Sequence, residues 1–360
     1  MFPSEIQHIR DRIKEIDPIR YAKTRNYAEG KVTRLSPYIS RGVISTRQLF
    51  DHLISLKLEW AAIEKLVQEL AWRDYWQQIW IAKGNEINQD LRNTQTPVVS
   101  RKVPKNIVDS NTKITAVDNA ISTLYECGYM HNHMRMYVAS ITCNVANAHW
   151  FKPAQWMYYH LLDGDWASNA LSWQWVAGAN ANKKYYANQE NINRFFGTSQ
   201  QHTFLDVSYE DFDEMPIPEL LKDFIELELN TELPISHDQL EDKKTLIYNY
   251  YILDSDWHAE EDYQRVLIFE PSFYRTYPVS NKCIEFVIKL SRNIPNIKLF
   301  VGEFHELSEI IKEDIIFKEH PTNTSYKGVR EQREWLTNVT GYYPSFFKFW
   351  KHAKKQLIRE

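Results

Sequence analysis

The 360-residue sequence is poor in cysteine and in long apolar runs. Its three cysteines, Cys127, Cys143 and Cys283, are too few and too scattered for a disulfide framework or a four-thiolate iron–sulfur site, so we expect reduced thiols. No apolar run reaches the roughly 18 residues of a membrane span, and the N-terminus shows no basic flank ahead of a hydrophobic segment. We therefore expect a cytoplasmic protein.

Glycine-rich phosphate loops are also missing, since the ten glycines form no dinucleotide-binding fingerprint. There is no internal repeat and no low-complexity tract. In contrast, 43% of the residues are hydrophobic, which is enough core material for one large domain or two ordinary ones. The composition predicts a folded globular protein.

Charge is unevenly distributed although the net charge is only −4. Residues 1–200 hold 24 Lys and Arg against 18 Asp and Glu, whereas residues 201–360 hold 19 against 29. Such asymmetry allows the first part to meet a polyanion while the second part stays away from it. An ordinary solvated surface explains the same numbers.

The hydrophobic period divides the chain into three segments. Residues 1–205 show helical patterns, as in residues 63–81, where apolar side chains recur at 3.6 spacing. Residues 206–243 are acidic and indicate a linker with one short helix near residues 220–228. Residues 244–360 alternate between strand and helix patterns, which predicts a smaller α/β domain with an open, mostly parallel sheet. The predicted strands are residues 245–253, 265–270, 297–301 and 315–318, and a helix is predicted at 281–292.

The first polar cluster lies ahead of a predicted helix start. It consists of Thr33, Arg34, Leu35 and Ser36, with Tyr21 upstream. Hydroxyls and backbone N–H groups at such a place form a phosphate cradle. The alternative is an ordinary Ser or Thr helix cap.

The second cluster surrounds Trp72. Glu69 and Arg73 are four residues apart, and Trp72 and Trp76 repeat on an adjacent helical face. This face suits stacking on a base and hydrogen bonding to it. The alternative is a surface ion pair beside two core tryptophans.

The third cluster is a polar helical face in an apolar setting. Asn132, Arg135 and Met136 are at i, i+3 and i+4, so they share one side of a helix. Buried polar groups need partners, and this face suggests a polar, aromatic ligand inside a helical bundle. The neighbouring His131 and His133 match no standard zinc spacing, so we predict no metal.

The fourth cluster combines two carboxylates with an amide and two indoles. Asp163, Asp165 and Asn169 lead to Trp173 and Trp175. The carboxylates can bind ribose hydroxyls or balance an arginine, which leaves the amide for a heterocycle. The aspartates are also candidates for a helix cap.

In this order the four clusters resemble the flavin-binding domain of the DNA photolyase and cryptochrome family, over roughly residues 18–196. The resemblance implies an all-α domain that binds FAD through Tyr21, Thr33, Arg34, Leu35, Ser36, Asn132, Arg135, Asp163, Asp165 and Asn169. It implies a pocket for a flipped-out pyrimidine dimer, lined by Glu69, Trp72, Arg73, Asn132, Met136 and Trp175. It also implies catalytic roles for Glu69, Asn169, Trp173 and Trp150.

The domain order departs from the family pattern. Members of the family carry an α/β antenna domain before the flavin domain, whereas here the flavin-domain resemblance begins almost at the N-terminus. Residues 245–253, 265–271 and 297–303 loosely resemble the opening strands of that antenna domain. We therefore hypothesise a circular permutation, and we leave open whether an antenna chromophore binds. His133 also stands where the family has an arginine.

The family's chain of three electron-transferring tryptophans is incomplete. Trp173 corresponds to the member nearest the flavin and Trp150 to the middle one, but the region around Pro97 has no tryptophan for the outer position. Photoreduction of the flavin is then either impaired or rerouted through another aromatic residue such as Trp156 or Trp80.

The resemblance implies a monomer that binds ultraviolet-damaged DNA and repairs pyrimidine dimers in light. Glu69 would hydrogen-bond the dimer, Trp72 and Trp175 would sandwich it, and Asn169 would tune the flavin. The alternative is a cryptochrome-like blue-light receptor without repair activity. A third possibility is an unrelated redox or structural role.

Overall fold

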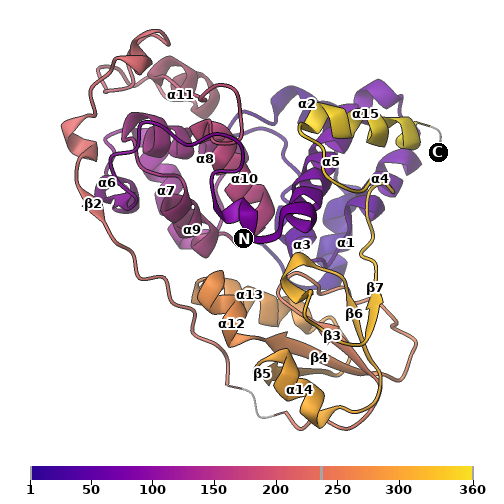
Figure 1. Cartoon of the computed structure of the whole chain (residues 1–360). Helices are drawn as coiled ribbons and strands as arrows, with labels where there is room; N and C mark the ends of the chain where they lie inside the picture. Colours follow the sequence, from indigo (N-terminus) through magenta and orange to yellow (C-terminus); the bar gives the residue numbers. More distant parts are fainter. Residues whose placement is uncertain (1, 236–237, 359–360) are drawn as a thin grey trace. The chain divides into compact units, whose positions relative to one another are not determined.

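The computed structural model describes residues 2–235 and 238–358 (Figure 1). Its backbone forms two compact units, each assembled from separate segments of the chain. Unit 1 comprises Met1–Ile19, Thr33–Ala82 and Asn230–Glu360, and unit 2 comprises Arg20–Val32 and Lys83–Leu229. The predicted division into residues 1–205, 206–243 and 244–360 stays a prediction.

Unit 2 consists mainly of helices, two of which are followed by a glycine that acts as the C-cap. Helix α7 ends at Gly128, with φ of 70°, and α10 ends at Gly178, with φ of 81°, a backbone region that favours glycine. A π-helical turn, Ile141–Val145, continues α8. The helices are α6 (Lys105–Val108), α7 (Thr115–Cys127), α8 (Asn132–Ser140), α9 (Phe151–His160), α10 (Trp166–Ala177), α11 (Gln189–Phe196) and the part of α2 (Pro18–Thr24) from Arg20 onward. The short strands β1 (Val103–Pro104) and β2 (Phe224–Ile225) pair antiparallel.

The helical part of unit 1 centres on the 24-residue helix α5 (Trp60–Lys83). It contains no glycine or proline, and its buried side chains include Ile63, Leu66 and Leu70, which confirms the predicted helix over residues 63–81. The other helices of this part are α1 (Ile6–Lys14), α3 (Ser36–Ser40), α4 (Thr46–Ser55) and the C-terminal α15 (Phe346–Leu357).

The α/β part of unit 1 is a five-stranded, fully parallel sheet with strand order β5-β4-β3-β6-β7. Its strands are β3 (Thr245–Tyr248), β4 (Gln264–Phe269), β5 (Ile297–Val301), β6 (Ile315–Lys318) and β7 (Val329–Glu331), and its helices are α12 (Pro271–Thr276), α13 (Asn281–Ser291) and α14 (Phe304–Ile310). This confirms the predicted parallel sheet. Strand β7 was not predicted, because its three residues are too few for a periodic pattern.

Helices cover both faces of this sheet, with α14 on one side and α12 and α13 on the other (Figure 1). Ile247, Val266 and Ile268 point to the α14 face, where they pack with Phe304 and Leu307. Their neighbours along β3 and β4 are buried on the opposite face, because successive side chains of a strand alternate. Burial on both faces explains why these strands are continuously apolar.

A buried turn between α3 and α4 packs on the carboxyl end of β3. The Arg41 side chain is fully buried, with its guanidinium carbon 3.7 Å from the ring centroid of Tyr250 and a hydrogen bond to the Tyr250 carbonyl oxygen. Gly42 has φ of 63°, and a Cβ there would lie 2.4 Å from the Tyr251 carbonyl oxygen. Only glycine allows this approach.

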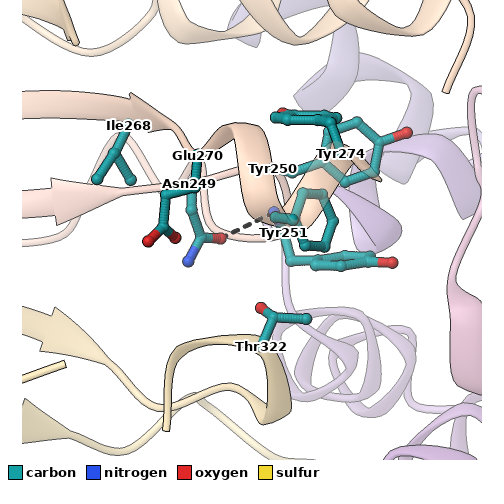
Figure 2. Close-up of a pocket in the computed structure, with 8 residues that line it drawn as sticks. Asn249, Tyr250, Tyr251, Ile268, Glu270, Tyr274 and Thr322 are labelled. Atoms are coloured by element: carbon teal, nitrogen blue, oxygen red, sulfur yellow. Dashed lines mark hydrogen bonds between the residues drawn. The ribbon is translucent and has the colours of Figure 1, made fainter. Parts of the chain in front are cut away.

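Strands β3 and β6 adjoin where the strand order reverses, which is where open α/β sheets generally bind ligands. A small pocket lies at this edge, between the turn that follows β3 and the end of β4 (Figure 2). Arg41 and the Tyr250 and Tyr251 rings pack next to it. The lining residues are Asn249, Tyr250, Tyr251, Ile268, Glu270, Phe273, Tyr274 and Thr322.

One predicted element is wrong. Residues 220–228 do not form a helix but a single 3₁₀ turn, Glu219–Leu221, followed by strand β2. Asn106 explains part of the difference, because its side-chain amide donates to the Leu220 carbonyl oxygen and β1 pairs with β2. No helix within the described residues is long and apolar enough to cross a membrane.

Candidate functional site

A buried ion pair joins α8 to the turn before α10 in unit 2. One Arg135 nitrogen lies 2.8 and 3.0 Å from the two Asp163 carboxylate oxygens, and Arg135 Nε donates to the Met130 carbonyl oxygen at 2.9 Å. The Asp163 side chain is only 3% exposed, against 19% for Arg135. The predicted charge balance between this arginine and an aspartate is therefore present, and it fixes the guanidinium in place.

Asp165 and Asn169 lie in the first turn of α10. Asp165 is the N-cap, and its Oδ1 accepts a hydrogen bond from the Ser168 N–H at 2.7 Å, as the capping alternative predicts. The Asn169 amide nitrogen donates to the Ala154 carbonyl oxygen at 2.8 Å. Asn169 Oδ1 accepts no hydrogen bond within residues 2–235 and 238–358, so it is the end of the amide that remains for a ligand.

The remaining unit 2 candidates differ in exposure. Asn132 is exposed at the start of α8, whereas Met136 on the same face is half-buried. Trp175, near the end of α10, is 37% exposed, and its ring lies 5.7 Å from that of Tyr185. Most tryptophans of this chain are buried, so an exposed indole marks a surface that is available for stacking.

The two tryptophans expected to carry electrons are buried in unit 2. Trp173 is 2% exposed and Trp150 is fully buried. The Trp150 indole nitrogen donates to Asp90 Oδ1 at 2.7 Å, and the same carboxylate lies 3.2 Å from His149 Nε2. The sequence does not indicate that Asp90 binds Trp150, because Asp90 lies in an irregular segment 60 positions before it.

The proposed alternatives for the missing outer tryptophan lie in different units. Trp156 of unit 2 is buried, and its indole nitrogen donates to the Tyr125 hydroxyl at 3.0 Å. Trp80 of unit 1 packs edge-on against Tyr251 and Tyr277 in the α/β part. Trp156 is therefore the one of the two that shares a unit with Trp150 and Trp173.

The predicted phosphate cradle lies ahead of α3 in unit 1. Thr33 Oγ1 accepts a hydrogen bond from the Leu35 N–H at 3.4 Å, and Arg34 adopts φ of 54°. The N-cap of α3 is Leu35, which has no side-chain cap, so the alternative of an ordinary Ser or Thr cap is wrong. Tyr21 is half-buried on α2 in unit 2.

The second cluster lies on α5 of unit 1. Glu69 pairs with Lys65 at 3.1 Å, and Arg73 donates to the Ser40 hydroxyl at 3.0 Å and to the Ile39 carbonyl oxygen at 3.4 Å. Arg73 therefore ties α5 to α3.

Trp72 is half-buried and stacks on Phe346 of α15, with ring centroids 3.7 Å apart. Sequence reasoning missed this contact, because nothing in a local pattern links α5 to the C-terminus.

Asp74 is a further buried carboxylate that the sequence pattern does not reveal. It accepts hydrogen bonds from the Leu336 N–H at 2.8 Å and from the Thr46 hydroxyl at 3.1 Å. Burial raises its pKa to about 6. It joins α4, α5 and the segment before α15.

His133 belongs to an aromatic cluster in unit 2. Its Nδ1 lies 3.0 Å from the Asn26 carbonyl oxygen, and its ring packs on Tyr137 and Phe195. Burial lowers its pKa, so the ring is neutral near pH 7. Within the described residues no group of three or more His, Cys, Asp or Glu side chains is arranged to hold a metal.

Comparisons with known proteins identify relatives of this chain. A family model described as the FAD binding domain of DNA photolyase matches residues 66–255. The deoxyribodipyrimidine photo-lyase of Alkalihalophilus pseudofirmus is 30% identical over 154 residues, which cover 40% of this chain and 31% of that protein. Cryptochrome DASH of Danio rerio is 30% identical over 166 residues, which cover 44% and 32%. The matches thus span about a third of the length of these relatives.

A solved cryptochrome from Synechocystis sp. PCC6803 has a similar fold. It superposes with a TM-score of 0.50 at 22% sequence identity, and the match covers 61% of this chain and 48% of that one. At this identity the likeness concerns the fold alone.

The side chains present suit FAD in their chemistry. Unit 2 offers the Arg135 cation held by Asp163, the Asp165 carboxylate and the Oδ1 acceptor of Asn169. A flavin ring has carbonyl oxygens and ring nitrogens that match such donors and acceptors, and ribose hydroxyls match a carboxylate. The donor set therefore fits the cofactor.

Proposed function

The chain belongs to the DNA photolyase and cryptochrome family, whose FAD-binding domain it carries, and we propose that it is a light-dependent DNA-repair flavoprotein that splits cyclobutane pyrimidine dimers. The observation that carries the proposal is the exposed Trp175 on α10, the helix that carries Asn169 and is capped by Asp165. An indole left 37% exposed offers a stacking face to an unpaired base. When bound and reduced, FAD supplies the light-excited electron that ring splitting requires.

Several side chains of unit 2 would bind and orient FAD. Arg135, fixed by Asp163, would place a positive charge beside the flavin ring. Asn169 would hold a protonated ring nitrogen, because its Oδ1 can only accept and its amide nitrogen is engaged by Ala154. The resemblance also assigns Thr33, Arg34 and Ser36 to the FAD phosphates.

On the substrate side, Glu69 would hydrogen-bond the dimer, while Trp72 and Trp175 would each stack on a base. Flipping a dimer out of the duplex costs less than flipping an intact base, because the lesion already disturbs pairing and stacking. The resemblance also assigns Asn132 and Met136 to contacts with the lesion. Arg73, which anchors α5 to α3, would support Trp72 from the neighbouring position.

Illumination of the reduced, purified protein with a dimer-containing oligonucleotide tests the proposal. We expect blue light to remove the dimer from the wild type and not from a Trp175→Ala variant. Tyr209→Ala is the matched control, because Tyr209 is another exposed aromatic residue of unit 2 and has no assigned role. If the dimer survives illumination of the wild type with fully reduced FAD, the repair function is wrong.

The second candidate is a blue-light receptor that repairs nothing. It is favoured by the cryptochrome DASH match and by the missing outer tryptophan of the electron-transfer chain. A repair enzyme has to prefer a lesion over intact DNA, whereas a receptor needs no such preference. Titration with damaged and with matched undamaged DNA at the same salt concentrations separates the two.

We also propose that the chain is a circular permutant of the family. The parallel sheet of residues 245–331 follows the residues that resemble the flavin domain, whereas the family's antenna domain precedes them. Superposing residues 245–331 alone on the antenna domain of a family member tests this. The same strand order with the same chain direction supports permutation, and a different order contradicts it.

A further inference from the structure

The outward side of α15 combines lysines with an exposed aromatic ring. We call it the α15 basic face, and it consists of Phe347, Lys348, Lys351, His352 and Lys355, all of them exposed. Phe347 is 70% exposed, and among the large hydrophobic side chains of residues 2–235 and 238–358 only Ile235 is more exposed. We propose that the α15 basic face is a docking surface for the sugar–phosphate backbone of DNA, in addition to any lesion-binding residues. This inference rests on the proposed function for its choice of partner.

The opposite side of α15 holds the helix rigidly on α5. Phe346, Phe349, Trp350, Ala353 and Leu357 are at most 6% exposed. Phe346 stacks on Trp72, the Phe349 ring lies 5.6 Å from that of Tyr75, and Lys354 pairs with Glu64. The basic face is therefore presented by a fixed helix rather than by a loose tail, so it does not need to be ordered when a partner binds.

The segment before α15 reinforces this attachment. The Tyr75 hydroxyl donates to the Tyr343 carbonyl oxygen at 3.1 Å, and the Gly341 N–H donates to Gln78 Oε1 at 3.0 Å. The Leu336 N–H donates to the buried Asp74 at 2.8 Å. These hydrogen bonds attach residues 336–343 to α5 at three points.

The charges on this face fit a polyanion. No Asp or Glu occurs between Trp335 and Ile358, although residues 201–360 as a whole are acidic. Lys348, Lys351 and Lys355 are spaced at i, i+3 and i+7, so they lie along one side of the helix. Within residues 2–235 and 238–358 none of these three lysines forms an ion pair, so their charges stay available to phosphates.

The geometry favours DNA over a membrane surface. An amphipathic helix binds lipid by burying its apolar face among acyl chains. Here that face is already buried on α5, and the side turned to solvent offers Phe347 as a single aromatic ring among cations. Lysines beside one exposed ring match a nucleic acid, where the ammonium groups contact phosphates and the ring stacks on a base.

The test measures how the affinity of the 360-residue holoprotein for a short undamaged DNA duplex depends on salt. In the variant Lys348→Gln/Lys351→Gln/Lys355→Gln, we expect the slope of log K against log salt to fall by about 2 to 3, at roughly 0.9 for each lost phosphate contact. The matched control is Lys289→Gln/Lys312→Gln/Lys327→Gln, which removes the same charge from exposed positions of the α/β part and should keep the wild-type slope.

Phe347→Ala supplies a second measurement. We expect it to weaken binding to single-stranded DNA at least about fivefold and to duplex DNA less, because only unpaired bases stack on a protein ring. Phe347 is exposed, so this variant and the lysine variant should keep the wild-type circular dichroism spectrum and thermal midpoint.

Several outcomes would overturn the inference. One is an unchanged salt slope in the lysine variant, even if the wild type repairs dimers. Another is a change seen only in binding to vesicles of phosphatidylglycerol and phosphatidylcholine, which would assign the face to lipid. If instead the wild type fails to repair dimers but shows the expected slopes, the proposed repair function is wrong and the docking surface stands.

Discussion

The phenyl ring of Phe346 lies parallel to the indole of Trp72, with 3.7 Å between ring centroids and 9° between ring planes. Trp72 is the α5 residue that the family resemblance assigns to the lesion pocket. One side of its indole is therefore occupied by the C-terminal helix of the same chain. A base that stacks on Trp72 has to use the part of the indole that Phe346 leaves exposed.

Replacing Phe346 by alanine is expected to destabilise unit 1. The side chain is 3% exposed, and truncation of a buried phenylalanine costs about 3 to 5 kcal/mol in free energy of unfolding. Urea unfolding measures the loss, and hydrogen exchange should show faster opening of α15. The neighbouring Phe347→Ala should change stability by less than about 0.5 kcal/mol, since that ring is exposed. Equal effects of the two changes would contradict the packing described.

Replacing Asp163 by asparagine should leave Arg135 as an uncompensated, largely buried charge. We expect a loss of about 3 to 5 kcal/mol in free energy of unfolding, together with a lower FAD content measured by visible absorbance. The pair of Arg10 and Asp256 is the matched control, because its carboxylate is 61% exposed. Asp256→Asn should cost at most about 1 kcal/mol and leave the FAD content unchanged.

Replacing Trp150 by phenylalanine should separate photoreduction from repair. The variant loses the indole that donates to Asp90, and with it one member of the predicted electron route. We expect slower photoreduction of FAD with an external thiol, but unchanged dimer repair once FAD has been reduced chemically. Trp335→Phe, in a half-buried position of unit 1, is the control. Wild-type photoreduction in Trp150→Phe would rule out this route.

Asp74 should make stability depend on pH. Its pKa is about 6 in the folded chain against 3.8 for an unperturbed aspartate, so the folded state binds more protons between these values. The contribution of Asp74 to the free energy of unfolding is therefore fully present below about pH 3.8, and about 3 kcal/mol of it is lost as the pH rises through 6. An Asp74→Asn variant should lose this part of the pH dependence in urea titrations. Asp51→Asn, at an exposed position, should keep the wild-type profile.

Patterns that repeat along the sequence predicted the elements well. Strands β5 and β6 lie at the residues expected, and α13 ends one residue before its predicted end. The apolar run of β6 marks a largely buried parallel strand, whereas β5 is half-buried along its length at the edge of the sheet. The predicted strand over residues 245–253 is shorter in the structure, where β3 ends at Tyr248 and the chain turns at Asn249. Residues 245–253 contain no proline or glycine that would indicate a turn.

The assignment of the candidate residues to FAD and to a lesion stays a prediction, but the structure shows which contacts among these residues the sequence anticipated. Arg135 and Asp163 form an ion pair as expected, because a buried charge is costly unless an opposite charge lies next to it. The contacts of Asp90 with Trp150 and of Asp74 with Leu336 join residues that are distant in sequence. A single sequence offers no periodic signal for such pairs.

The packing of Arg41 on Tyr250 bears on how the chain folds during synthesis. The two residues are 209 positions apart, and Gly42 permits the same close approach to Tyr251. At a synthesis rate of 5–20 residues per second, roughly 10 to 40 s pass between the emergence of the two partners. Until Tyr250 and Tyr251 have been synthesised, the Arg41 guanidinium has no aromatic rings to pack on. The α3–α4 turn thus reaches its final packing only after most of the chain has been synthesised, as does α5, whose Asp74 binds Leu336.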